Sequence, residues 1–366
     1  MAKTKKKKIS AIDLFCGAGG LTHGFLLEGI DVRVGIDIDE GCQYPYTQNN
    51  VNSVFLKRSV AEVDGAELST YFRENEIRIL AGCAPCQPFS TFRHTYDKKK
   101  KKAIAQGIEV EEVDERWSLL GEFGRIAEEL GPNIITMENV PKLLSHSIFG
   151  EFVAKLESLG YYVTKKSVDC SKYGLPQKRR RLVLFASKKG EIEFPETDIL
   201  YKEKKTVEDV IGGLPFLEAG KQCEDDPLHK ARNLAPINKK RILASTPGGT
   251  WRDWDKSLLP DCYKVDTGAT FQSVYGRMEW EEPSPTITTQ FFGYGTGRFG
   301  HPTQNRALSL REGALLQTFP PTYKFAPEDD PLAFNRVGQW IGNAVPVDLG
   351  RIIALTIKNH ISKYEW

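Results

Sequence analysis

The chain has 366 residues, of which 40% are hydrophobic and 27% are charged, and its formal net charge is +2. This is an ordinary globular composition with enough apolar residues for a large core. The seven cysteines form no dense pattern, which argues against a disulfide framework and favours a reducing compartment. No apolar run has the length of a secretory signal or a membrane span, so we expect a cytoplasmic protein that contacts no membrane.

Strand-like and helix-like segments alternate along the first half of the chain. Strands are predicted at 9–15, 31–39, 77–82, 133–140 and 181–187, and helices at 21–29, 118–130 and 150–160. This alternation predicts an α/β fold with a doubly wound, mostly parallel sheet.

The composition changes near residue 190, where a segment rich in glycine, proline and aromatic residues begins and runs to about residue 300. It predicts a second, smaller, loop-rich domain. The end of the chain, 345–364, predicts a helix that returns to the first domain. The expected domains are therefore 1–192, 193–329 and the returning segment 330–366.

Basic residues gather in short runs, at 3–8, 98–102, 178–181 and 238–241. A single run of this kind is usually solvated surface. Several runs on one protein favour a polyanionic partner, although the net charge is small.

The stretch "DLFCGAGG" (13–20) follows a strand and opens a helix, as in turns where a ligand approaches bare backbone. Gly17 and Gly19 match the start of a dinucleotide fingerprint, but Thr22 replaces its third glycine, which weakens an NAD or FAD assignment. Asp37 ends the next strand, where a carboxylate accepts hydrogen bonds from ribose hydroxyls. The pattern suits S-adenosylmethionine, with a purely structural glycine turn as the alternative.

Cys83 and Cys86 form a C-x-x-C at the end of a predicted strand. A zinc site needs four ligands, and the chain has no second C-x-x-C or H-x-x-x-H motif. A dithiol redox pair usually opens a helix, whereas Pro88 and a polar segment follow here. A single nucleophile at the carboxyl end of a parallel strand is the favoured interpretation, with zinc and redox roles as weaker alternatives.

A thiol with a pKa of about 8.5 needs activation and a suitable electrophile. The stretch "MENV" would bring Glu138 to the same sheet edge, and "QKRRR" (177–181) adds guanidinium groups. These groups suit the methylation of cytosine at carbon 5. Addition of a thiolate at carbon 6 makes carbon 5 nucleophilic, and a carboxylic acid at ring nitrogen 3 favours that addition.

Six motifs in order, "DLFCGAGG", "APCQPFS", "MENV", "LPQKRRRLVLF", "NRALSLREGALLQTFP" and "IGNAVP", cover nearly the whole chain. In this respect the chain resembles the DNA (cytosine-5) methyltransferases of prokaryotic restriction-modification type. The resemblance implies a Rossmann-like cofactor domain for S-adenosylmethionine, a target-recognition domain, and a cleft for duplex DNA with one cytosine flipped out.

The resemblance also implies roles for individual residues. Its implied catalytic group is Cys86 as nucleophile, Glu138 as acid at nitrogen 3, Arg179 and Arg181, with Asn139 holding the loop. The implied cofactor residues are Phe15, Gly17, Gly19, Leu21, Asp37, Ile38, Leu119, Asn343 and Val345. The implied DNA-binding residues are Gln87, Ser90, Lys98, Lys99, Lys100, Gln177, Thr286, Ile287 and Arg306. No metal site is expected, and Cys83 is expected to be a small buried residue without a chemical role.

Two positions depart from the family pattern. Ile38 stands where an aromatic residue often stacks on adenine, and Ser59 stands about where an aspartate often contacts the adenine amino group. The expected protein is a nucleoid-associated monomer, paired with a restriction endonuclease that acts on the same site. The alternatives are a catalytically silent DNA-binding regulator and a tRNA cytosine-5 methyltransferase.

Overall fold

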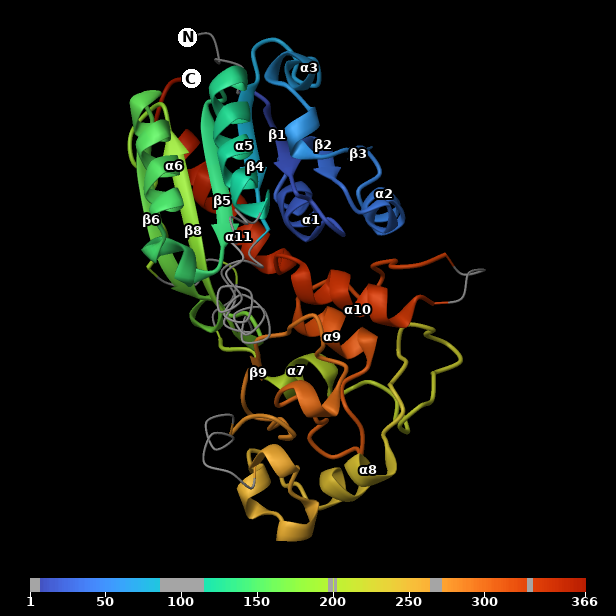
Figure 1. The fold of residues 1–366 in the computed structure, drawn as a ribbon. Helices are drawn as coiled ribbons and strands as arrows, with labels where there is room; N and C mark the ends of the chain where they lie inside the picture. Colours follow the sequence, from blue (N-terminus) through green and yellow to red (C-terminus); the bar gives the residue numbers. More distant parts are fainter. Residues whose placement is uncertain (1–6, 86–114, 197–199, 201–202, 264–271, 328–331) are drawn as a thin grey trace, which may run out of the picture.

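A seven-stranded sheet organises the first half of the chain in the computed structural model, which describes residues 7–85, 115–196, 200, 203–263, 272–327 and 332–366 (Figure 1). Its strand order is β3-β2-β1-β4-β5-β8-β6. The strands are β1 (Ile9–Leu14), β2 (Asp31–Asp37), β3 (Val54–Lys57), β4 (Ile77–Gly82), β5 (Ile134–Asn139), β6 (Tyr162–Asp169) and β8 (Arg180–Ser187). Only β8 runs antiparallel to its neighbours, so the predicted doubly wound, mostly parallel α/β sheet is confirmed.

Helices cover both faces of this sheet. On one face pack α3 (Gly65–Ser69), α5 (Glu115–Leu130) and α6 (Ser147–Ser158), and on the other pack α1 (Gly20–Leu27) and α11 (Val347–Ile361). Neighbouring residues of β1 show why: Ile12 joins the first core and Ala11 the second, because successive side chains of a strand point to opposite faces. A strand buried on both faces is mostly apolar, as Ile9, Ala11, Ile12 and Leu14 show, which made β1 recognisable.

The closeness of α1 and α11 depends on glycine. A Cβ atom on Gly24 would lie 2.5 Å from the carbonyl oxygen of Val347, too close for any side chain. The C-terminal helix therefore packs directly on the helix that follows the glycine turn, as Figure 1 shows for the red and blue ends of the chain.

The order of the strands creates a switch point between β1 and β4. The chain winds outward from β1 to β2 and β3, then returns to β4 on the other side of β1 and continues to β5. Ligands of open α/β sheets bind at the carboxyl edge of such a point. The glycine turn follows β1 and the C-x-x-C stretch follows β4, so both begin at this edge.

The lower part of the molecule in Figure 1 has little regular structure. Its elements are α7 (Val207–Ile211), α8 (Pro236–Leu243), β9 (Ser284–Pro285), α9 (Leu310–Leu316) and α10 (Phe334–Asn343), with β9 paired to β7 (Gln177–Lys178). Its main core contains several aromatic rings, among them Phe291, Phe292 and Phe319, and reaches Ala18 and Cys42 next to the sheet. Aromatic packing replaces regular backbone pairing as the organising contact here.

The stretch Phe334–Ile361, which contains α10 and α11, is long and apolar enough for a membrane span by composition. However, 72% of its most apolar window is buried inside the protein. Its apolar residues contact the two cores on which these helices pack, which accounts for the composition.

Two strands of the main sheet, β3 and β6, were not predicted from the sequence. The helices α2 (Gln43–Asn49), α3, α7, α8, α9 and α10 were not predicted either. Both missed strands lie at the edges of the sheet. An edge strand exposes much of its surface, so it lacks the apolar run that marks a central strand.

Candidate active site

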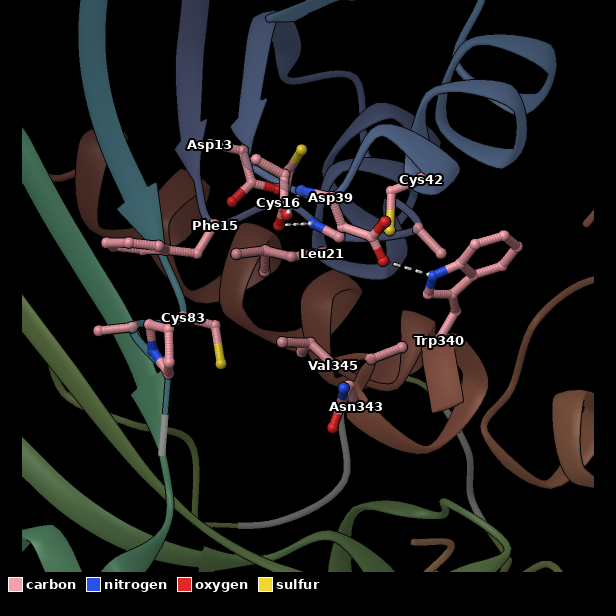
Figure 2. A pocket seen from close by; sticks show the side chains of 16 residues that line it. Asp13, Phe15, Cys16, Leu21, Asp39, Cys42, Cys83, Trp340, Asn343 and Val345 are labelled. Carbon is pink, nitrogen blue, oxygen red and sulfur yellow. Dashed lines mark hydrogen bonds between the residues drawn. The ribbon is translucent and has the colours of Figure 1, made fainter. Parts of the chain in front are cut away.

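A cavity of about 220 Å³ lies at the carboxyl edge of β1, β2 and β4 (Figure 2). Six of the residues predicted to hold the cofactor line it: Phe15, Gly17, Leu21, Asp37, Asn343 and Val345. Phe15 and Gly17 come from the turn after β1, Leu21 from the start of α1 and Asp37 from the end of β2. Asn343 and Val345 come from the end of α10 and the segment before α11. Residues more than 300 positions apart in the sequence therefore share one cavity.

The glycine turn has the backbone that a bound ligand needs. Gly17 has a φ of +50°, and a Cβ atom there would meet nothing within 4 Å, so this residue presents bare backbone to open space. Gly19 has a φ of +89°, but a Cβ atom there would lie 2.6 Å from the side chain of Asn50. Gly17 thus forms part of the cavity wall, whereas Gly19 allows the turn to pack against α2.

Asp37 is built into this turn by two hydrogen bonds. Its Oδ2 accepts from the backbone N–H of Gly17 at 2.8 Å, and its Oδ1 accepts from that of Asp39 at 2.9 Å. Burial raises the pKa of the carboxyl above its ordinary value. An ionised carboxylate offers about four acceptor positions, so capacity remains for two hydroxyl donors of a ribose.

Three predicted cofactor residues do not line the cavity: Gly19, Ile38 and Leu119. Ile38 is 73% exposed and forms no part of the wall. The aromatic residue on this side is Trp340, whose Nε1 donates to Asp39 Oδ2 at 2.8 Å (Figure 2). Its helical spacing of three from Asn343 was a signal for it, because both residues then lie on one side of α10.

Other cavity residues were also missed from the sequence, namely Asp13, Cys16 and Cys42. Asp13 accepts a hydrogen bond from Thr22 Oγ1 at 2.6 Å, and burial raises the pKa of its carboxyl to about 7. Burial likewise raises the pKa of the Cys16 thiol well above its ordinary value, so this sulfur is a neutral wall group. Asp13 and Cys16 belong to the stretch "DLFCGAGG", which was a signal for them, whereas Cys42 follows β2 and has no motif position.

A second cluster of polar side chains lies beside the cavity, around Glu138 at the end of β5. Glu138 is only 3% exposed. Its Oε1 lies 2.7 Å from Arg181 Nε, an ion pair held by charge because the two groups are not aligned as a hydrogen bond. Its Oε2 accepts from the thiol of Cys83 at 2.8 Å. Cys83 also lines the cavity and is half-buried, so only the expectation that it is fully buried needs correction.

Asn139 connects β5 to the stretch that leads toward Cys86. Its Nδ2 donates to the carbonyl oxygen of Ala84 at 3.1 Å, and its Oδ1 accepts from the N–H of Val140 at 2.8 Å. The residues that precede Cys86 are thus tied to the strand that carries Glu138.

Arg179 and Gln177 are interior groups. Arg179 is 2% exposed and donates to the backbone oxygens of Ile287 at 3.0 Å and Ala344 at 3.3 Å. Burial, with the neighbouring charge of Arg181, lowers the pKa of its guanidinium to about 10. Gln177 donates to Leu316 O at 3.1 Å. Both side chains therefore connect the sheet to the small domain.

The predicted DNA contacts need correction at three positions. Gln177, Ile287 and Arg306 are each 0% exposed, so their side chains do not reach a surface on which DNA could bind. Arg306 forms a bidentate ion pair with Glu312, with two contacts of 2.7 Å. The charge that looked available for a phosphate is satisfied inside the small domain.

Unlike these three buried residues, Thr286 lines a hollow rich in lysine and arginine, which we call the basic hollow. The hollow has a volume of about 590 Å³ and is lined by Asp169, Ser171, Lys178, Arg180, Arg181, Lys204 and Thr286. Arg181 belongs both to this hollow and to the Glu138 cluster. The hollow therefore extends from the surface toward the buried carboxyl.

Six predicted residues lie outside the described part of the chain: Cys86, Gln87, Ser90, Lys98, Lys99 and Lys100. Within the described part, no group of three or more histidine, cysteine, aspartate or glutamate side chains could hold a metal ion.

Comparisons with known proteins agree with this geometry. The family model for C-5 cytosine-specific DNA methylases matches residues 9–359. The chain is 49% identical to the Type II methylase M.HgiDII of Herpetosiphon aurantiacus, covering 96% of each protein. It is 29% identical to the Type II methyltransferase M1.BsuMI of Bacillus subtilis, covering 95% of this chain and 80% of that protein.

The fold is shared with a solved structure of a candidate DNA modification methyltransferase from an E. coli prophage, with a TM-score of 0.72. The two chains are 20% identical, and the match covers 97% of this chain and 100% of the other. Family and fold imply S-adenosylmethionine as the methyl donor and DNA as the substrate. The resemblance to the prokaryotic restriction-modification type is confirmed. The chain belongs to the C-5 cytosine-specific DNA methylase family and is a DNA (cytosine-5-)-methyltransferase.

Proposed function

We propose that this enzyme methylates carbon 5 of a flipped-out cytosine within a specific duplex DNA sequence, through covalent attack of Cys86 on carbon 6. The observation that carries the proposal is the Glu138 cluster beside the cavity. A buried carboxyl, a guanidinium and the stretch leading to Cys86 meet at one edge of the sheet. No other group of described residues combines these functions next to a cavity that is lined by a carboxylate and bare glycine backbone.

The cavity fits S-adenosylmethionine by the chemistry of its wall. Asp37 would accept the ribose hydroxyls, the bare backbone at Gly17 would lie against the ligand, and the Phe15 and Trp340 rings supply apolar surface. Asn343 and Val345 would close the cavity from the C-terminal side. When bound, S-adenosylmethionine supplies an electrophilic methyl group.

The protein groups have complementary tasks at the target base. The Cys86 thiolate forms a bond to carbon 6, while Glu138 donates a proton to ring nitrogen 3, so that the electron pair moves to carbon 5. After carbon 5 has taken the methyl group, a base from solvent removes the proton of carbon 5. Glu138 takes back the proton of nitrogen 3 and the Cys86 thiolate leaves carbon 6, which restores the aromatic ring. Arg181 would keep Glu138 in place and contact the base.

The burial of Glu138 supports flipping of the base. A carboxyl that is 3% exposed cannot reach a base stacked inside a duplex, so the cytosine has to leave the helix and enter the protein. Flipping costs a few kcal/mol, which stacking and hydrogen bonds in the pocket offset. The basic hollow, with Thr286 at its wall, would hold phosphates next to the extruded nucleotide.

We further propose the division of labour among the domains. Residues 1–192 form the catalytic domain, 193–329 the target-recognition domain, and 330–366 the segment that returns to the catalytic domain. The similarity to Type II methylases supports a role in protecting host DNA, with a cognate restriction endonuclease acting on the same site. The enzyme would work as a nucleoid-associated monomer.

The test is methyl transfer from labelled S-adenosylmethionine to duplex DNA and, separately, to tRNA. We expect incorporation into duplex DNA, and a denaturation-resistant adduct on a duplex with 5-fluorocytosine at the target. Cys86→Ala should abolish both while it still binds DNA. Cys223→Ala removes a thiol of the small domain and serves as the matched control. Methylation by Cys86→Ala, or incorporation into tRNA alone, would overturn the proposal.

A further inference from the structure

Cys83 touches the group to which the proposed function gives the acid's role. Its thiol donates to Glu138 Oε2 at 2.8 Å, from the segment directly after β4. Cys83 lines the cavity and Glu138 does not, so the thiol stands between the carboxyl and the open space. This hydrogen bond is a contact that an apolar residue of the same size could not make.

The two oxygens of Glu138 have neighbours of unequal strength. Oε1 faces the permanent positive charge of Arg181 at 2.7 Å, and Arg179 adds a second buried positive charge nearby. Oε2 faces a thiol, which is a weak hydrogen-bond donor. To contact a base, Glu138 has to break its interaction with one of these two neighbours. Breaking the weak hydrogen bond from the thiol costs less free energy than breaking the ion pair with Arg181.

We propose that Cys83 is a positioning residue for Glu138, which rests on the proposed function. Its thiol holds Oε2 of the resting carboxylate toward the cavity side before the base arrives. Once Oε2 has taken up a proton from solvent, it donates that proton to ring nitrogen 3 of the flipped cytosine, which takes the place of the thiol. Arg181 remains on Oε1 throughout. The weakness of the thiol as a donor is what makes it suitable, because a strongly bound donor would compete with the base.

The kinetic test compares Cys83→Ala with Cys83→Ser, using Cys223→Ala as the control. We expect Cys83→Ala to lower kcat about tenfold, because Oε2 loses its donor and the carboxyl is no longer held in one orientation. KM for duplex DNA should stay within roughly twofold, since the lost contact lies inside the protein and not on a DNA-binding surface. Cys83→Ser, whose hydroxyl can donate to the same oxygen, should recover most of the loss.

A spectroscopic test does not depend on turnover. The S–H stretching band of Cys83, isolated as the difference between wild type and Cys83→Ala, should shift to higher frequency in Glu138→Gln, because an amide oxygen is a weaker acceptor than a carboxylate. An unshifted band, full activity of Cys83→Ala, or equal losses in the alanine and serine variants would overturn the inference.

The outcome for Glu138→Gln separates this inference from the proposed function. If Glu138→Gln methylates as fast as wild type, the acid assigned under the proposed function is wrong. If Glu138→Gln is inactive while Cys83→Ala has full activity, the proposed function stands and only the role of Cys83 fails.

Discussion

Arg179 donates a hydrogen bond to the carbonyl oxygen of Ile287 at 3.0 Å, joining residues that are 108 positions apart. The N–H of Ile287 in turn donates to Gln177 Oε1 at 3.0 Å, and Thr286 Oγ1 donates to Lys178 O at 2.9 Å. These hydrogen bonds therefore join the segment before β8, residues 177–179, to the loop of the small domain that contains residues 286 and 287. Arg181 and Thr286 take their positions from this connection.

Arg179→Ala should weaken this connection. The substitution leaves the backbone oxygen of Ile287 without its donor and removes one of the two donors to the oxygen of Ala344, which keeps Gln317 Nε2. An unsatisfied buried group costs about 1–3 kcal/mol. We expect the free energy of unfolding to fall by roughly 3 kcal/mol and methylation to fall by more than tenfold. Urea denaturation and a methyl-transfer assay would measure both effects.

The adjacent Arg180 is the matched control for this prediction, because its side chain is 77% exposed. Arg180→Ala should change the free energy of unfolding by no more than about 0.5 kcal/mol. If Arg179→Ala and Arg180→Ala lose the same free energy of unfolding, the buried hydrogen bonds of Arg179 do not contribute to stability.

Asp37→Asn should weaken the binding of S-adenosylmethionine. An amide has only one acceptor oxygen, so either Gly17 or Asp39 loses its backbone hydrogen bond and the ribose loses a charged acceptor. We expect the dissociation constant, measured by titration calorimetry, to rise at least about tenfold. Asp31→Asn, at the opposite end of β2, should bind the cofactor like wild type. An unchanged affinity in Asp37→Asn would contradict the proposed ribose contact.

Asp13 predicts a pH dependence of stability. Burial raises the pKa of its carboxyl from 3.8 to about 7, so between these values the folded protein holds a proton that the unfolded chain releases. Stability from this group is therefore present at low pH and is lost as the pH rises toward 7, with a slope of at most about 1.4 kcal/mol per pH unit.

The measurement compares wild type with Asp13→Asn, because other titrating groups cancel in the difference. Urea denaturation between pH 4 and pH 8 should show wild type losing stability relative to the variant as the pH rises. Parallel curves for the two proteins would mean that this carboxyl does not titrate in that range.

The basic hollow predicts the salt dependence of DNA binding. Arg180 and Lys204 line it, and both side chains are more than half exposed. If each contacts a phosphate, Arg180→Ala and Lys204→Ala should each reduce the slope of log affinity against log salt by about 1, for cognate and unrelated duplexes alike. Lys189→Ala, beyond the opposite end of β8, should leave the slope unchanged. If neither Arg180→Ala nor Lys204→Ala changes the slope of log affinity against log salt, DNA phosphates do not bind in the basic hollow.

The sequence alone determined the central sheet and the side of the sheet on which the site lies. Strands β1, β4 and β5 are buried along nearly their whole length and form mostly apolar runs. In β2, buried apolar residues alternate with the half-buried Asp31 and Arg33. The edge strand β6 contains the exposed Lys165 and Lys166 and showed no such run. Gly17 and Asp37 were predictable together because a βα unit returns the chain to the same sheet edge.

Only the tertiary structure decided which side chains meet across long separations. Trp340 reaches the cavity because α10 packs against the loop after β2, and the Cys83 thiol meets Glu138 because β4 and β5 are neighbours in register. Gln177 and Arg306 looked like surface groups for DNA until their interior partners were visible. Local pattern shows which residues can do chemistry, whereas packing decides whether a charged group faces solvent, a ligand or another buried charge.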